Sequence, residues 1–391
     1  MSETWWVNPD QLDEDQKEVV KLSGTGSYLV QGPPGCGKTN LLLLRANYIS
    51  LTEKPNILIL TFTRTLREFI ALGGEQYSFP LNKIKTHMSW SKEFLHMFGI
   101  CPNEGEGFLV QRTNLCGQIN ELIDNRGLED FYDAILLDEA QDYLPEEIEV
   151  FYRLSKTIFA VADSHQKIYN GTSPLSVLER IVDDTKTLKF HYRNGRKICR
   201  LAEEVFPTSA KEKHNFMSIS SQYDEEAKPS TVDKIKCGTF EEECDNIIKS
   251  LRVQVRAYPD EMLGVICPTN KGLERIWGQI SRSDLAEYSV KQSSQVGYEG
   301  FTQKTRICCS TIHSAKGLEF RTLHMPCIED ISKLDLEINI CFTAITRAKT
   351  SLTMYHVAPI PGYLERAFAI VNADPLESKP EPDFAQIFGG H

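Results

Sequence analysis

The stretch "VQGPPGCGKTN" (residues 30–40) decides the fold, because it fits a phosphate-binding signature in the surroundings that this signature requires. The pattern G-x-x-x-x-G-K-[ST] is met by Gly32, Gly37, Lys38 and Thr39. Apolar residues 27–31 precede it as a predicted strand, and residues 40–49 follow as a predicted helix. A chance glycine-rich turn is the alternative, and the strand and helix on either side argue against it.

Such a loop turns its backbone N–H groups toward a phosphate chain, and the helix N-terminus adds positive potential. Lys38 is then expected at the β- and γ-phosphates and Thr39 at Mg²⁺. The expected cofactors are therefore ATP and Mg²⁺. The expected nucleotide-binding residues of this loop are Gly32, Pro33, Pro34, Gly35, Cys36, Gly37, Lys38, Thr39 and Asn40.

A second motif, "ILLDEAQD" (135–142), places carboxylates directly after a predicted strand. Ligands of open α/β sheets bind at the carboxyl ends of the strands. Asp138 is thus predicted as a Mg²⁺ ligand together with Thr39, and Glu139 as the group that orients or deprotonates a water molecule. The alternative is a solvated strand end, since acidic residues are common at helix starts.

Short apolar runs alternate with amphipathic helical stretches along the whole chain. Runs covered on both faces are typical of parallel sheets. The pattern predicts an α/β protein of two domains, with the seam near 186–193. The predicted strands are 27–31, 56–63, 133–139, 157–163 and 187–193 in the first set, and 263–269, 306–311, 321–327 and 351–357 in the second.

The composition indicates a reduced, cytoplasmic protein. The 391 residues include 54 acidic and 43 basic residues, and this excess of acid argues mildly against bulk coating of nucleic acid. The 11 cysteines contain no C-x-x-C pair, which favours buried free thiols over a zinc or iron–sulfur site. The N-terminus lacks a secretory pattern, and no apolar run approaches the ~20 residues of a membrane span.

Two further residues are candidates on weaker grounds. Gln166 follows the predicted strand in "FAVADSHQKIY" (159–169) and could contact a γ-phosphate or the hydrolytic water, or else belong to an ordinary polar loop. Arg347 is expected in the middle of a helix in "FTAITRAK" (342–349). A buried arginine needs a partner such as a phosphate in a domain cleft; the alternative is a surface arginine with a buried stem.

The order of the motifs resembles the UvrD/Rep-type helicases of superfamily 1, from about residue 10 to about residue 358. The stretches that carry the resemblance are "LDEDQKEVV", "QGPPGCGKT", "LTFTRTLREF", "KTHMSWSKEF", "LLDEAQD", "ADSHQKIY", "FHYRN", "STIHSAKGLEF" and "FTAITRAK". The family implies two RecA-like domains with ATP in the cleft between them. The expected boundaries are 1–189 for the first domain, with a small helical insert at about 91–132, 190–360 for the second domain, and 361–391 for a tail.

The resemblance also implies roles for individual residues. Gln16 and Tyr192 are expected at the adenine and Glu319 at the ribose, and Gly317 is a further expected nucleotide-binding residue. Arg193 is expected at the γ-phosphate, and Arg347 as a second arginine finger. The residues expected on a nucleic-acid strand are Phe62, Arg64, His87, Trp90, Tyr169, Thr311 and His313. For the aromatic residues, Trp90 above all, packing in the core is the alternative.

The chain departs from this family in two respects. It is too short for two large accessory domains, and Tyr169 is followed by "NGTSPL" where relatives have a tryptophan that stacks on a base. The first expectation is an ATP-driven translocase or helicase on single-stranded DNA, with RNA as an alternative and 3′→5′ polarity favoured by "AKGLEF". The second is a nucleic-acid-gated ATPase switch that serves a protein partner such as a repair or phage-defence nuclease. An unrelated small-molecule kinase ranks last.

Overall fold

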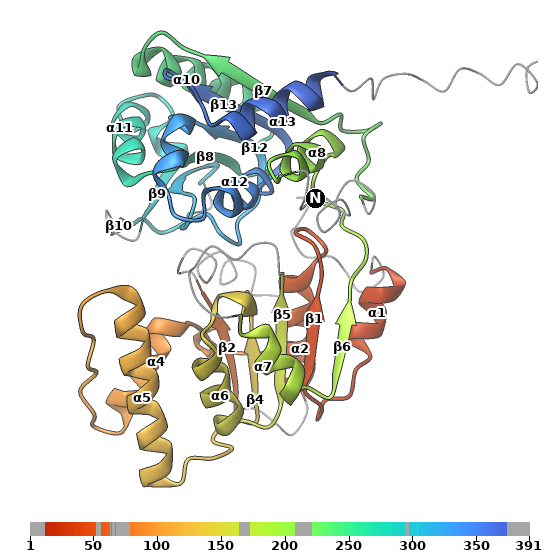
Figure 1. Ribbon diagram of the computed structural model, residues 1–391, viewed down its shortest axis with the longest axis vertical. Coiled ribbons are helices and arrows are strands. Elements are labelled where there is room, and N and C mark those ends of the chain that lie inside the picture. Colours follow the sequence, from red (N-terminus) through yellow and green to blue (C-terminus); the bar gives the residue numbers. More distant parts are fainter. Residues whose placement is uncertain are drawn as a thin grey trace, which may run out of the picture.

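The protein folds into two α/β parts, each built around its own sheet (Figure 1). The computed structural model describes residues 12–51, 56–62, 64, 67, 79–163, 173–207, 221–293, 297–302 and 304–373. The chain passes from the first sheet to the second between Thr187, where β6 ends, and Arg196, where α8 begins. Among the described residues, no helix is long and apolar enough to cross a membrane.

The first sheet is parallel and has six strands in the order β3-β2-β4-β5-β1-β6. Its core strands are short apolar runs, as the sequence predicts. The elements of this part are α1 (Glu14–Val20), β1 (Tyr28–Gln31), α2 (Lys38–Ser50), β2 (Ile57–Thr61), β3 (Ile84–Thr86), α4 (His87–Met97), α5 (Phe108–Arg126), β4 (Ala134–Leu137), α6 (Pro145–Leu154), β5 (Ile158–Ala162), α7 (Leu175–Ile181) and β6 (Asp184–Thr187).

Both faces of this sheet are covered, because successive side chains of a strand point to opposite faces. In β4, Leu136 packs on the side of α2, whereas Ile135 and Leu137 pack on the side of α4, α5 and α6. The central strands are therefore buried on both sides. The polar residues at the carboxyl ends of these strands can therefore form a binding site at that edge of the sheet.

The segment between β3 and β4 contains two helices, α4 and α5, which lie beside α6 at one edge of the first part (Figure 1). Thr86 caps α4 by accepting a hydrogen bond from the Ser89 amide. Gly127 ends α5 in the left-handed conformation. The helices pack on the first core through Trp90, Phe94 and Leu115, among others.

The second sheet has seven strands in the order β10-β9-β11-β8-β12-β13-β7. All pairs are parallel except β9 with β10. The elements are α8 (Arg196–Glu204), β7 (Thr231–Lys236), α10 (Phe240–Ala257), β8 (Leu263–Cys267), α11 (Asn270–Ile280), β9 (Ser289–Ser293), β10 (Gly297–Tyr298), β11 (Ile307–Thr311), β12 (Phe320–Met325), α12 (Glu337–Ile345), β13 (Ala348–His356) and α13 (Gly362–Ala373). Helices α10 and α11 cover one face, and α8, α12 and α13 cover the other.

Two expectations about the chain's course are wrong. The strand expected at 187–193 lies at Asp184–Thr187 instead, and His191 makes only an isolated bridge to Ser221. The expected tail from residue 361 begins with a packed helix, because α13 buries Leu364 and Phe368 against the second core. The rest of that tail lies outside the described residues.

Candidate nucleotide site between the two domains

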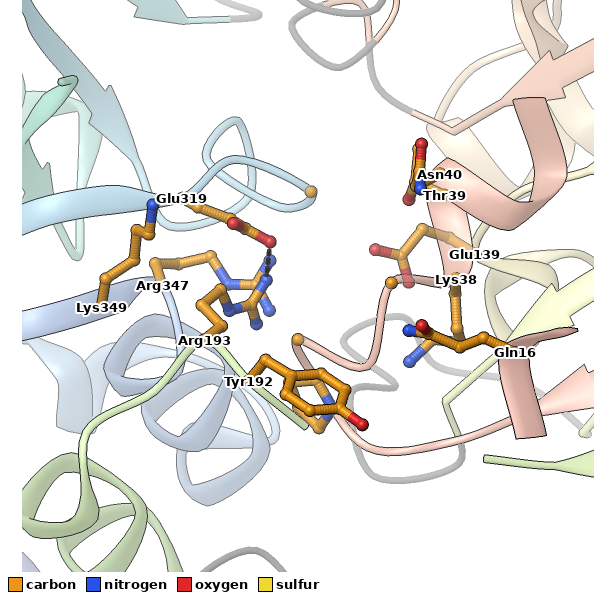
Figure 2. A pocket seen from close by; sticks show the side chains of 14 residues that line it. Gln16, Lys38, Thr39, Asn40, Glu139, Tyr192, Arg193, Glu319, Arg347 and Lys349 are labelled. Atoms are coloured by element: carbon orange, nitrogen blue, oxygen red, sulfur yellow. Dashed lines mark hydrogen bonds and ion pairs between the residues drawn. The ribbon is translucent and has the colours of Figure 1, made fainter. Parts of the chain in front are cut away.

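A cavity of about 410 Å³ lies between the two parts of the chain (Figure 2). Its volume is in the range of small-molecule and cofactor sites, roughly 300–1,000 Å³. The first part contributes the phosphate loop, the start of α2 and the carboxylate motif. The second contributes residues before α8, after β11 and around β13. The lining residues are Gln16, Pro34, Gly35, Gly37, Lys38, Thr39, Asn40, Glu139, Tyr192, Arg193, Gly317, Glu319, Arg347 and Lys349.

The loop needs glycine at two positions for different reasons. Gly35 has a φ of 79°, and a Cβ atom there would lie 2.6 Å from the Cβ of Arg193. Gly37 has a φ of 84°, and a Cβ atom there would lie 2.9 Å from Nε2 of Gln16. Both glycines thus permit a left-handed backbone and a close approach to a residue of another segment.

The side chain of Lys38 lies inside the loop. Its ammonium group donates hydrogen bonds to the carbonyl oxygens of Gly32 (2.7 Å) and Pro33 (2.8 Å), and it lies 3.7 Å from the Cys36 sulfur. Gly32, Pro33 and Cys36 do not line the cavity themselves, so in this structure they support the loop through their contacts with Lys38 and Gln16.

The Thr39 hydroxyl and the Asp138 carboxylate meet at the end of β4. Thr39 donates to Asp138 over 3.1 Å, and burial, followed by repulsion from Glu139, raises the pKa of Asp138 to about 7. Glu139 has a φ of 50°, which is uncommon outside glycine and directs its side chain into the cavity. Strained residues of this kind cluster at functional sites.

Two arginines of the second part face the loop across the cavity (Figure 2). Arg193 forms an ion pair with Glu319. Arg347 donates to the carbonyl oxygens of Thr343 (3.0 Å) and Leu318 (3.3 Å). Burial, with nearby Arg193 acting in the same direction, lowers the pKa of Arg347 to about 10, which leaves it charged at neutral pH.

The expectation that Arg347 sits in the middle of a helix is wrong. Helix α12 ends at Ile345 with Thr346 as its C-cap, and β13 begins at Ala348. Arg347 therefore occupies the junction between helix and strand, where its side chain is 2% exposed. This junction fixes the arginine more firmly than a helix surface would.

Gln16 and Tyr192 also line the cavity. Gln16 belongs to a capping box with Asp13 at the start of α1, and its Nε2 donates to the Cys36 carbonyl oxygen over 3.0 Å. The Tyr192 hydroxyl donates to Asp13, and its ring is 41% exposed. A ring held in this way presents a free face at the mouth of the cavity.

A buried ion pair joins the two parts of the chain next to the cavity. The Lys316 ammonium, in the loop after β11, contacts the Asp142 carboxylate and lies 3.8 Å from Glu139. Burial raises the pKa of Asp142, while the charge of Lys316 opposes that rise. The sequence analysis missed Lys316 and Lys349. The signal for Lys316 was the same as for Arg347, a cation in a stretch of small and apolar residues.

The expected nucleic-acid residues separate into two groups. Thr311, the last residue of β11, is 6% exposed, whereas Phe62 after β2 and His313 after β11 are half-buried and Arg64 is exposed. His87 and Trp90, by contrast, are 4% and 2% exposed.

The Trp90 ring stacks on Phe94 with centroids 5.5 Å apart and donates to the Tyr132 hydroxyl over 3.1 Å. The expectation that His87 and Trp90 present their rings to a strand is therefore wrong for this structure, since both pack in the core. Gln166 and Tyr169 lie outside the described residues.

The residues of the cavity fit the expected nucleotide and cation. Within the described part of the chain, the buried Nη2 of Arg193 has no hydrogen-bond partner, and a phosphate oxygen would satisfy it. The Thr39 hydroxyl and the Asp138 carboxylate are oxygen donors of the kind that Mg²⁺ prefers. No cluster of three or more His, Cys, Asp or Glu side chains suited to a metal occurs among the described residues.

Residues that fit the phosphate-loop signature lie at the end of a parallel strand and face a second α/β part across a cavity, which defines a two-domain α/β fold with a site between its domains. Residues 306–355 match the family model described as the UvrD-like helicase C-terminal domain. This match confirms the predicted resemblance to UvrD/Rep-type helicases over β11, β12, α12 and β13. No curated protein matches the chain.

The solved structures that are similar to this chain include three that are described as helicases or as a domain of one. One is the C-terminal domain of a possible DNA helicase from Lactobacillus plantarum WCFS1, with 16% identity, a TM-score of 0.33, and coverage of 46% of this chain and 96% of that one. The helicase of PRRSV has 16% identity and a TM-score of 0.41 over 87% of this chain and 54% of its own. Arterivirus nonstructural protein 10, a helicase, has 15% identity and a TM-score of 0.41 over 90% and 63%. The chain thus spans less than two thirds of the two viral proteins.

Proposed function

We propose that the protein is a nucleic-acid-dependent ATPase that moves along single-stranded DNA, with 3′→5′ polarity. One observation carries the proposal: Arg193 and Arg347 of the second part face the phosphate loop of the first across a single cavity. An arginine side chain of the second domain can stabilise the phosphate group that is being transferred only when the cleft is closed. Hydrolysis is thereby linked to the angle between the domains, and each affects the other.

Each residue of the cavity has a defined task in this proposal. Lys38, Arg193 and Arg347 hold the β- and γ-phosphates, and Glu139 accepts a proton from the attacking water. Tyr192 and Gln16 hold the adenine, and Glu319, next to Gly317, holds the ribose. Mg²⁺, when bound at Thr39 and Asp138, neutralises phosphate charge.

The nucleic acid is expected to lie across both domains near Phe62, Arg64, Thr311 and His313. Base stacking on an aromatic ring contributes about 1–3 kcal/mol per base. Phe62 and His313 are the ring candidates that the structure leaves outside the fully buried core.

The test is the ATPase rate, titrated with single-stranded DNA, single-stranded RNA and duplexes. We expect a weak basal rate and strong stimulation by single strands. Lys38→Ala should abolish ATP turnover, and Arg347→Ala should lower kcat by about 10³-fold or more. Arg252→Ala is the matched control, because Arg252 forms an exposed ion pair with Asp284 in the second part of the chain. Equal rates with and without nucleic acid would count against the proposal.

A second candidate function follows from the small size of the insert. Between β3 and β4 the structure has only α4 and α5, so the first part lacks a large accessory domain there. The protein could then act as a nucleic-acid-gated switch that signals to a partner such as a nuclease. A strand-displacement assay separates the two functions, because the switch hydrolyses ATP without displacing a strand.

A further inference from the structure

A buried arginine on α5 lies between the proposed nucleic-acid face and the carboxylate motif. The Arg112 side chain is 2% exposed. Its Nε donates to Glu147 Oε1 over 2.9 Å, and its Nη2 donates to the backbone carbonyl oxygen of Asp142 over 3.0 Å and to the second Glu147 oxygen. One guanidinium group therefore joins α5, α6 and the loop that follows β4.

The same guanidinium contacts Phe62, one of the expected nucleic-acid residues, and Phe108, which lies beside it. Its central carbon lies 5.1 Å from the ring centroid of Phe62 and 5.5 Å from that of Phe108. The two rings are 6.3 Å apart, and Phe108 is 45% exposed at the start of α5. The ring planes are at 77° to each other, so a base can stack on one ring at a time, and in doing so it would press on the guanidinium group that both rings contact.

Arg112 is also connected to the second domain, through Asp142. Asp142, whose carbonyl oxygen accepts from Arg112, holds Lys316 through its carboxylate. The neighbouring Gln141 donates to Glu139 Oε2 over 2.6 Å. A shift of Arg112 would therefore move the backbone between Glu139, the proposed water-activating group, and Asp142, which pairs with Lys316 of the second domain.

Stability alone does not account for this arrangement. A buried ion pair adds little net stability compared with apolar residues of similar size. Glu147 also accepts from the Leu144 amide over 2.8 Å at the start of α6, which a glutamine oxygen could do as well. Burial raises the pKa of Glu147, but His87 and Arg112 outweigh this effect and lower that pKa, so Glu147 stays ionised.

We propose that Arg112 is a positioning residue that transmits occupancy of the Phe62–Phe108 face to the carboxylate motif and to Lys316. The inference rests on the proposed function, since it concerns stimulation of the ATPase by single strands. It assigns a role to α5, which the sequence analysis predicts only as part of a small insert.

The experiment uses the full chain and three variants. Arg112→Met/Glu147→Gln removes both charges together and keeps the cap of α6. Arg112→Lys keeps the charge but offers one nitrogen, so it cannot serve Glu147 and the Asp142 carbonyl with the geometry of arginine. Arg153→Met is the matched control, because Arg153 also joins α6 to α5 but does so at the surface, through Asp124.

We expect the double variant to keep the basal rate, the KM for ATP and the affinity for a fluorescent single strand, and to lose about fivefold or more of the stimulated kcat. Arg112→Lys should lose most of the stimulation as well, and Arg153→Met none. Full stimulation in the double variant would overturn the inference. So would an equal fall of basal and stimulated rates, because that marks a structural role. If the unaltered protein is not stimulated by any single strand, the proposed function itself fails.

Discussion

Gln141 connects the carboxylate motif to the strand end after β5. Its amide nitrogen donates to Glu139 and its oxygen accepts from the Asp163 amide over 2.9 Å, while the side chain is 2% exposed. A side chain bonded at both ends holds Glu139 in one orientation. Gln141 therefore affects the position of Glu139, the group proposed to activate water.

We expect Gln141→Ala to retain ATP binding and to lose stimulation by single strands. The truncation frees the Glu139 carboxylate and leaves the Asp163 amide without this acceptor. The measurement compares the Kd for a fluorescent ATP analogue with the stimulated kcat. Unchanged stimulation would reduce Gln141 to a structural role.

Glu243 on α10 supplies a prediction about pH. The residue is fully buried, and burial raises the pKa of Glu243 to about 7, although the Cys327 amide donates to its carboxylate over 3.2 Å. The folded state thus holds this proton more tightly than the unfolded state. The stability from this group is present below pH 4.5, the ordinary value, and is lost as pH rises toward 7.

Glu243→Gln should therefore stabilise the protein at pH 8 relative to the unaltered chain, by on the order of 1–2 kcal/mol, and not at pH 4.5. Thermal unfolding of both proteins across this range measures the difference. Glu241→Gln, an exposed change on the same helix, is the control. A stability difference that does not vary with pH would contradict the prediction.

Residues of the site could be predicted from the sequence where they belong to one short motif. The phosphate loop and the pair Asp138–Glu139 each lie within a few consecutive residues, so their spacing carries the signal. Trp90 and Lys316 do not have this property. Whether an indole packs inward or a lysine reaches another domain depends on contacts between distant segments, which a single sequence does not display.

At the scale of elements, the buried strands were predictable and the edge strands were not. β4 and β8 are continuous apolar runs. β7 has the sequence TVDKIK and lies at the edge of its sheet, where polar residues are tolerated. Helix α13 had a readable signal, because Leu364, Ala367, Phe368 and Val371 follow helical spacing and all four are buried.

We expect α13 to be part of the second core and not a dispensable tail. Deletion of the chain from residue 362 onward should therefore lower the melting temperature strongly. Phe368→Ala should cost about 3–5 kcal/mol, because it leaves a cavity beneath the helix. Denaturant unfolding of each variant checks these values, and unchanged stability of the truncated chain would contradict them.

At the scale of the whole molecule, the two domains meet through the cavity and through the Lys316–Asp142 ion pair. The sequence order of motifs implied two domains with a cleft, and the structure has that arrangement. The ion pair between Lys316 and Asp142 could not be predicted from the sequence, because the two residues are 174 positions apart.

Lys316→Met should open the nucleotide-free protein. A buried Asp142 without its cation is unfavourable, and separation of the domains returns it to water. We expect a larger radius of gyration by small-angle scattering. Lys349→Met is the control, because Lys349 lines the same cavity but pairs with Glu261 of its own domain at 3.8 Å. An unchanged radius in Lys316→Met would show that other contacts hold the cleft.

The burial of the Lys316–Asp142 ion pair determines how the contact between the domains responds to ionic strength. The side chains of Lys316 and Asp142 have 0% exposure, so dissolved ions cannot come between them. Surface contacts with nucleic-acid phosphates, in contrast, weaken steeply as salt concentration rises. A sodium chloride titration should therefore release single-stranded nucleic acid while the distance between the domains stays constant. Salt thus offers a way to study the closed protein without bound nucleic acid.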